Sequence, residues 1–266
     1  MTTSSSDSAA SNPNDYPRVL VRPNHVERVP RRIRAVLAGE TILDTTFAHY
    51  VWELPFYPQY YLPLDSISAE YLVDDGVIEQ TPRGRVRVCS LVVGTARRPG
   101  AARVLDESTI TGLSATVHLD WAAVDAWYEE DERVFVHPRD PYTRVDALRS
   151  TRTVRVELDG VVLAESSSPV MVFETGLPTR YYVNRTEVNW QHLTPTDTET
   201  SCPYKGTTSG YWSAQVDGVT YDDLVWSYDF PTRDLLPIAG LVAFYNEKVD
   251  LVLDGRALPR PRTHFS

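Results

Sequence analysis

The sequence predicts an all-β protein, mainly antiparallel with few short helices, in which two tandem domains of one fold pack as a pseudo-dimer. Three observations lead to this fold class. A 35-residue segment recurs at an offset of 121 residues. Alternating apolar segments flank Asp-Gly turns, and helical periodicity is poor outside residues 120–131.

The repeat aligns residues 34–68 with residues 155–189 without a gap, and seven of the 35 positions are identical. Residues 122–136 also match 239–253, so both copies end alike. Such internal similarity indicates duplication of one small domain. The identical pairs are Arg34/Arg155, Leu37/Leu158, Gly39/Gly160, Val51/Val172, Glu53/Glu174, Tyr60/Tyr181 and Tyr61/Tyr182.

Hairpins account for most of the local pattern. In residues 153–166 the apolar Val154, Val156 and Leu158 alternate with polar residues before Asp159-Gly160, and the chain then returns through a second apolar segment. Asp-Gly between alternating segments predicts a type I′ turn. Residues 211–228 repeat the pattern around Asp217-Gly218. Residues 120–131 fit either one short helix or a turn into a strand.

We therefore expect a disordered or extended tail over residues 1–30, a degenerate first domain over 31–148, a second domain over 149–258 and a C-terminal tail over 259–266. Residues 137–150, with two prolines, are the expected connector.

Composition excludes several functional classes. The net charge is −10 and no basic stripe carries interleaved aromatic residues, which argues against nucleic-acid binding. No apolar segment approaches 18 residues, and the first 16 residues lack the features of a secretory signal, so a cytoplasmic location is expected. The two cysteines and six histidines show no metal-ligand spacing, and no cofactor is implied.

Four motifs of the second half resemble the DUF427 (NTP_transf_9) family: "VFETGLPTRYYV", "CPYKGTTSGYWS", "LVWSYDFP" and "IAGLVAFYNEKVDLVLDG". The first half resembles the same family more weakly. The resemblance implies a β-tent fold, two antiparallel sheets pinned at one end. Relatives of that fold carry a four-cysteine zinc site, which this chain lacks. The family's nucleotidyltransferase label is not supported, because no Gly-Ser turn precedes Asp217, Asp222 and Asp223.

Cys202 and Lys205 are the leading catalytic candidates. The chain has two lysines among 26 basic residues, and Lys205 follows Cys202 by three positions in a Pro- and Gly-containing turn. An ammonium beside a thiol favours the nucleophilic thiolate. The alternative is a small buried cysteine beside an exposed lysine. The matching segment of the first half, "TPRGRV", keeps Pro82 but has neither Cys nor Lys, which suggests that the first domain is a scaffold.

The candidate substrate-binding residues surround this turn. Glu174 is expected to point into a pocket or to pair with Arg180, whose planar fork suits a carboxylate or phosphate. Tyr181 and Tyr182 should face opposite sides of one strand, one in the core and one in the pocket. Tyr204, Trp212 and Trp226 complete the set, although most such aromatics belong to cores.

Two functional hypotheses stay open. The first is an enzyme acting on a small metabolite, anionic or cyclic, at Cys202. The second is a binding module with an aromatic pocket and no turnover. A structural pseudo-dimer without ligand is a third reading. Further association into a homodimer is left open, and no reaction is specified by the sequence.

Overall fold

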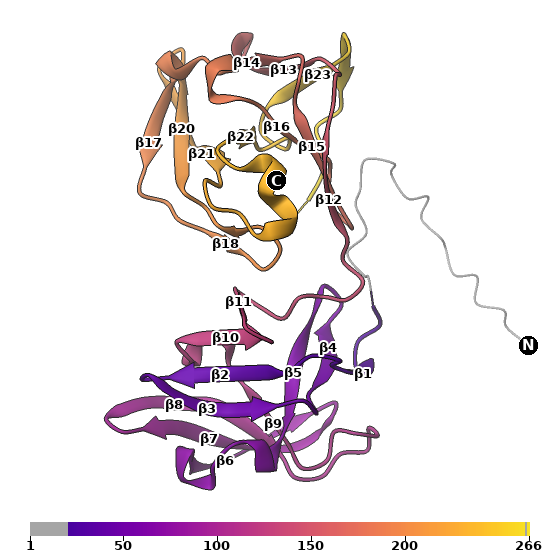
Figure 1. Cartoon of the computed structure of the whole chain (residues 1–266), viewed down its shortest axis with the longest axis vertical. Helices are drawn as coiled ribbons and strands as arrows, with labels where there is room; N and C mark the ends of the chain where they lie inside the picture. Colours follow the sequence, from indigo (N-terminus) through magenta and orange to yellow (C-terminus); the bar gives the residue numbers. More distant parts are fainter. Residues whose placement is uncertain (1–20, 264) are drawn as a thin grey trace, which may run out of the picture. The chain divides into compact units, whose positions relative to one another are not determined.

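The computed structural model describes residues 21–263 and 265–266 of the 266-residue chain. The chain divides into two compact units between Pro141 and Tyr142. Both units consist mainly of antiparallel strands, which confirms the predicted fold class (Figure 1). Residues 1–20 of the expected N-terminal tail lie outside the described residues, and the end of that tail forms the edge strand β1 (Val26–Arg28).

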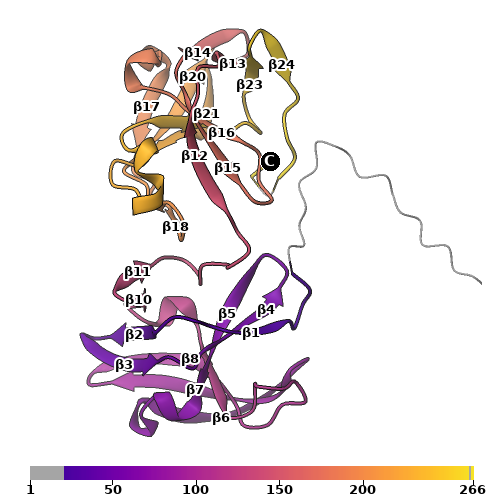
Figure 2. The same cartoon turned by 45° about the vertical axis from the view of Figure 1, so that its right-hand side comes forward.

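The first unit contains two antiparallel sheets, which Figure 2 shows as the indigo-to-magenta strands. The larger sheet has the order β1, β4 (His49–Leu54), β5 (Tyr57–Pro63), β9 (Thr116–Leu119), β8 (Ala96–Leu105), β7 (Gly84–Val93), β6 (Leu72–Thr81). The smaller sheet has the order β11 (Glu132–Val134), β10 (Ala126–Glu129), β2 (Ile33–Leu37), β3 (Glu40–Thr45).

The second unit repeats this plan. One group of strands is β12 (Val145–Arg149), β15 (Val170–Glu174), β16 (Arg180–Tyr182), and another is β22 (Val242–Phe244), β21 (Val219–Ser227), β20 (Gly210–Val216), β17 (Leu193–Thr196). A bridge between Val183 and Val242 links the two groups. A further sheet has the order β24 (Arg256–Leu258), β23 (Asp250–Leu253), β13 (Val154–Leu158), β14 (Val161–Ser166).

The strand order of the two units is the same, and so is the register. In the first unit Val51 pairs with Gln59, and in the second Val172 pairs with Arg180 at the offset of 121 residues. The 3₁₀ helices η1 (Leu64–Ser66) and η2 (Ala69–Tyr71) recur as η4 (Arg185–Glu187) and η5 (Trp190–His192). The structure thus supports the duplication that the sequence predicts.

The units differ in one hairpin. In the first unit β6 and β7 are joined directly by a turn at Pro82 and Arg83. In the second, the corresponding hairpin is interrupted, and its tip forms a separate two-stranded sheet of β18 (Ser201–Cys202) and β19 (Gly206–Thr207). This hairpin carries the Cys202–Lys205 motif.

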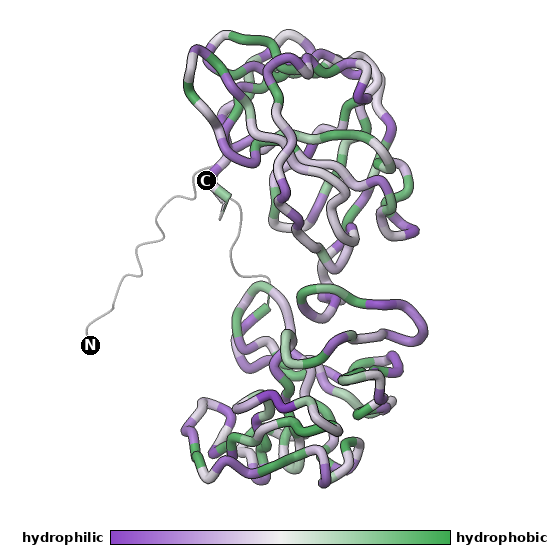
Figure 3. The backbone as a smooth tube through the Cα atoms, turned by 90° about the vertical axis from the view of Figure 1, so that its left-hand side faces the viewer, coloured by the Kyte–Doolittle hydropathy of each residue, from purple (hydrophilic) through white to green (hydrophobic). Residues whose placement is uncertain are grey.

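The predicted turns and core positions are confirmed. Asp159 and Gly160 both adopt positive φ, as a type I′ turn requires, and Val154, Val156 and Leu158 are buried. Residues 120–131 form a 3₁₀ turn, η3 (Trp121–Ala123), leading into β10, so the helical alternative is wrong. Figure 3 shows hydrophobic stretches alternating with hydrophilic ones along both units.

The domain junction differs from the expected one. Residues 137–150 were expected to form the connector, but Val145–Arg149 is strand β12, and it pairs along its whole length with β15. The first strand of the second repeat thus begins before the expected domain boundary at residue 149. A sixth 3₁₀ helix among the described residues, η6 (Arg233–Ile238), follows β21 and packs Leu235 and Ile238 into the core of the second unit.

Candidate functional site

The Cys202–Lys205 motif forms the tight turn between β18 and β19. Gly206 adopts a φ of +95°, a conformation that favours glycine. The segment after β21 holds the turn, since the Thr232 backbone N–H donates to the Lys205 carbonyl at 3.1 Å and its hydroxyl to the Tyr204 carbonyl at 2.5 Å. These two hydrogen bonds hold the backbone of Tyr204 and Lys205 in place.

Lys205 is buried and its ammonium donates to the Glu174 carboxylate at the end of β15. Only 11% of the Lys205 side chain and 9% of the Glu174 side chain are exposed. Burial by itself lowers the pKa of Lys205, but Glu174, Cys202 and Tyr182 outweigh it and raise that pKa above the ordinary lysine value. The amine is therefore a charged donor at neutral pH and not a base.

Tyr182 lies beside this ion pair and belongs to the buried aromatic cluster of the unit. Trp226 donates its indole N–H to the Tyr182 hydroxyl at 3.1 Å. Burial raises the pKa of Tyr182 to about 12, while Lys205 and Trp226 oppose the shift. Tyr182 is thus a neutral hydroxyl at physiological pH. Tyr181 packs in the other core of the unit, so the two side chains face opposite sides of β16 as predicted. Both are buried, however, and the prediction that one of them faces a pocket is wrong.

Cys202 is partly exposed, whereas the other thiol, Cys89, is buried in β7. The Cys202 thiol is close enough to Lys205 and Tyr182 to act on the pKa of each. The structure therefore brings Glu174, Tyr182, Cys202 and Lys205 together, from three separate segments of the second unit: β15, β16 and the β18–β19 hairpin.

Arg180 has a different partner from the one that the sequence suggested. Its guanidinium forms a two-pronged pair with Glu247, with N–O distances of 2.6 and 2.8 Å, and both side chains are buried. The expected Glu174–Arg180 pair is wrong, because Glu174 pairs with Lys205. Three aromatic rings surround the guanidinium, each with its centroid 5.6 to 5.7 Å away: Trp226, Tyr245 and Phe265.

The three remaining candidates lie apart from the cluster or only beside it. Trp212 packs against Trp190, with centroids 5.2 Å apart, and Arg185 stacks on it. It borders the core that contains Tyr181, so it does not join Cys202. Tyr204 lies within the turn itself and is partly exposed. Trp226 is 6% exposed and supports Tyr182 from the core.

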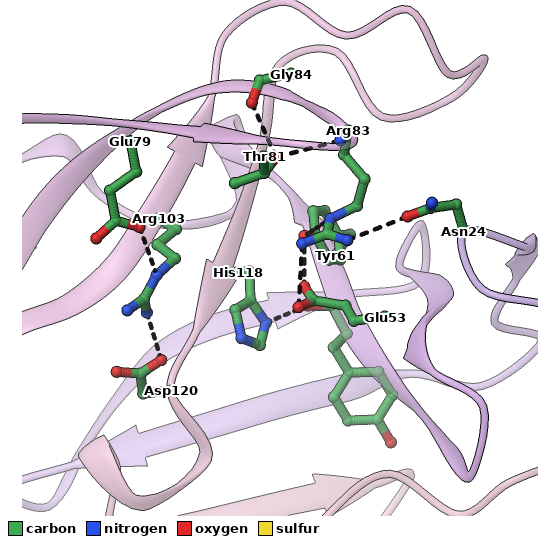
Figure 4. A network of polar contacts seen from close by, with 11 residues as sticks. Asn24, Glu53, Tyr61, Glu79, Thr81, Arg83, Gly84, Arg103, His118 and Asp120 are labelled. Atoms are coloured by element: carbon green, nitrogen blue, oxygen red, sulfur yellow. Dashed lines mark hydrogen bonds and ion pairs between the residues drawn. The ribbon is translucent and has the colours of Figure 1, made fainter.

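The first domain contains a matching network that the sequence comparison missed. Arg83, at the β6–β7 turn, forms an ion pair with Glu53 at 3.1 Å and donates to the Tyr61 hydroxyl at 2.7 Å (Figure 4). Glu53 and Tyr61 align with Glu174 and Tyr182. The fixed offset set Gly84 opposite Lys205, but a turn shorter by one residue places Arg83 there. The sequence signal for this equivalence is a basic residue followed directly by glycine, which occurs after Pro82 as it does after Pro203.

Within residues 21–263 and 265–266, no three histidine, cysteine or acidic side chains gather as a metal site requires. Asp223 accepts hydrogen bonds from Thr196 and Thr198, both at 2.7 Å, and so has a structural role in β21. In the same part of the chain no helix has the length and apolarity to cross a membrane.

Comparison with known proteins agrees with the duplicated architecture. The model of the NTP_transf_9 family, described as a domain of unknown function (DUF427), matches residues 25–130 and 146–255. No curated protein matches the chain. The two matched segments coincide with the two units of the structure, apart from their ends. The chain therefore belongs to the NTP_transf_9 (DUF427) family and carries its domain twice.

Proposed function

We propose that the second domain binds a small polar metabolite at the Cys202–Lys205 turn. The observation that supports this most strongly is the buried ion pair of Lys205 and Glu174 beside a partly exposed thiol. Buried charges are costly unless they are paired, and such pairs are weak evidence for stability alone. Shifted pKa values gathered around one exposed nucleophilic group are typical of functional sites.

The charges favour an amide-like ligand over a simple anion. Glu174 compensates the charge of Lys205, so the pair attracts a net negative ligand only weakly. It offers an acceptor and a cationic donor side by side. A planar group with a carbonyl next to an N–H, such as a linear or cyclic amide, matches both. Neutral Tyr182 adds a hydroxyl to the same cluster.

A reaction at Cys202 is the second candidate function. Lys205 stays charged and lies close to the thiol. In this reaction the Cys202 sulfur attacks the carbonyl carbon of a bound amide, the C–N bond breaks, and the amine leaves with the proton of the thiol. Water then hydrolyses the thioester and restores the thiol, while Lys205 stabilises the negative charge that develops during the attack. The buried aromatic cluster behind Tyr182 gives this site a rigid wall.

Alkylation of Cys202 tests the proposal, because iodoacetamide carries a primary amide and iodoacetate is its anionic counterpart. The ratio of the two rates at Cys202 is measured in the native protein and in urea, by mass spectrometry of the cysteine-containing peptides. We expect a native ratio that favours the amide over the ratio in urea. The buried Cys89 is the internal reference for a closed thiol.

Substitutions give the control. Glu174→Gln leaves Lys205 uncompensated, and the native preference should then shift towards iodoacetate. Lys248→Met changes the other lysine, which is exposed, and should leave the ratio unchanged. If native Cys202 reacts as slowly as Cys89, no small molecule reaches the cluster and the proposal fails. A Glu174→Gln ratio equal to that of the unmodified protein refutes the role of charge compensation.

A further inference from the structure

The first domain reproduces the construction of the Cys202–Lys205 turn without its thiol. Arg83-Gly84 takes the place of Lys205-Gly206, and both glycines have positive φ. In both domains the segment after the penultimate strand of the large sheet holds the cationic residue's carbonyl. Ser108 donates its hydroxyl to the Arg83 carbonyl at 2.5 Å, as Thr232 donates its N–H to that of Lys205.

Gly84 shows how tightly this turn is built. Its φ is +140°, and a Cβ at this position would stand 2.7 Å from the Glu107 carbonyl oxygen. Only glycine allows the Ser108 segment to approach the turn so closely. Arg83, which precedes Gly84 in this turn, is buried, with 8% of the residue exposed. The position of Arg83 is therefore fixed by the backbone.

The Arg83 network ends at the surface with donor capacity left over. Its guanidinium has five N–H groups, and three bond to Tyr61, Asn24 and Glu53 among the described residues. No acceptor among the described residues occupies the other two N–H groups. The Glu53 side chain is 27% exposed, so solvent reaches the network at this residue. The Tyr61 hydroxyl donates to the other Glu53 oxygen at 2.6 Å and holds that carboxylate in place.

His118 forms one wall of this network. Its ring stacks on Tyr61, with centroids 5.5 Å apart and planes inclined by 16° (Figure 4). Its Nδ1 lies 3.1 Å from the Tyr60 carbonyl, so Nδ1 carries the proton and donates. Burial lowers the pKa of His118, against the opposing effect of Glu53. The ring is thus neutral near pH 7, and Arg83 is the cation that contacts Glu53 and Tyr61.

We propose that the first domain holds a second binding site, in which Arg83 and Glu53 take a planar amide group of a small molecule. The carbonyl accepts the two remaining Arg83 N–H groups and the amide N–H donates to Glu53. The planar guanidinium of arginine holds an acceptor with two N–H groups of fixed geometry, whereas an ammonium does not fix the orientation of its donors. The site has no thiol and so binds without covalent chemistry. It stands independently of the function proposed for the second domain.

The test is ligand-observed ¹⁹F NMR on the full chain with 4-fluorobenzamide, and with 4-fluorobenzoate as the anionic counterpart. We expect the amide to bind better than the acid. Arg83→Gln should weaken amide binding roughly tenfold or more, the size expected for lost hydrogen bonds to a charged group. Arg83→Lys keeps a cation at the turn, as in the second domain, and serves as the variant that retains the fold while losing the fork.

Two variants locate the binding. Lys205→Met removes the cation of the other domain and should leave a first-domain component of amide binding intact. Arg87→Gln changes an arginine on the adjacent strand that pairs with Asp106, and should have no effect. The proposal is overturned if neither probe binds, if the acid binds better than the amide, or if binding survives both Arg83 variants. Binding lost only in Lys205→Met assigns the ligand to the second domain alone.

Discussion

Replacing Lys205 by methionine should destabilise the second domain by about 3–5 kcal/mol, the range for removing one partner of a buried ion pair. The substitution keeps an unbranched apolar stem but leaves Glu174, with 9% of its side chain exposed, without its cation. Both charges of the pair are shielded from water, so little screening reduces the effect. This is a large share of the 5–15 kcal/mol typical of a domain.

The double substitution Lys205→Met with Glu174→Gln should cost less than the sum of the two single changes, because it leaves no unpaired charge. The free energies come from urea unfolding followed by proteolysis at peptide resolution, so that the two domains are measured separately. Lys248→Met is the matched control and should stay within about 0.5 kcal/mol. A Lys205→Met loss no larger than that of the control would refute the buried pair.

Three further predictions concern the turns and the buried ionisable groups. Gly84→Ala should destabilise the first domain by about 3 kcal/mol or more, because the new Cβ would stand 2.7 Å from a carbonyl oxygen. Gly160→Ala should cost roughly 1 kcal/mol, because nothing lies within 4 Å of a Cβ at that turn. Thermal melts of the two variants test this difference. The pKa of Tyr182 is raised to about 12 from an ordinary 10. The contribution of Tyr182 to the free energy of unfolding is therefore fully present below pH 10 and falls by roughly 3 kcal/mol as the pH rises towards 12. Tyr182→Phe should remove this alkaline loss when unfolding is measured as a function of pH. Burial opposes ionisation of Glu247, but Arg180 and Thr263 lower its pKa below 4.5, so its contribution is present above that pH and is lost on acidification; Glu247→Gln should remove this acid dependence.

The fold could be predicted from the sequence because its signals are local. Asp159-Gly160 and Asp217-Gly218 specify hairpin turns, and the alternation around them specifies which residues are buried. The duplication then extends these predictions from one half to the other. The domain junction was harder to predict, since strand β12 (Val145–Arg149) forms through pairing with a strand more than twenty residues away.

The site could be predicted only in part, because ion-pair partners depend on contacts across sheets. Arg180 meets Glu247 from a segment 67 positions away, and Lys205 meets Glu174 over 31 positions. Spacing along the chain specifies neither pair. Trp212 was misplaced for a simpler reason. It alternates with Tyr211 along β20, and it is Tyr211 that packs in the core with Tyr182.

The sequence comparison did not predict the Arg83 network, because an alignment at a fixed offset misaligns residues where one turn is shorter by one residue. Glu53 and Tyr61 keep the offset of 121 residues from Glu174 and Tyr182, since they lie on paired strands whose register is fixed. The turn between β6 and β7 is free to shorten. Arg83 and Lys205 are equivalent because Arg83 pairs with Glu53 as Lys205 pairs with Glu174.

The most direct measurement of the central claim uses the fact that the chain has two lysines, Lys205 and Lys248. Selective ¹³C,¹⁵N labelling of lysine gives two side-chain signals, which Lys248→Arg assigns, and their shifts are followed through a pH titration. We predict that the Lys205 amine stays protonated as the pH passes 10.5, the ordinary lysine value, and that Glu174→Gln lowers the pH at which it titrates. Titration of Lys205 at or below pH 10.5 with Glu174 in place would contradict this claim.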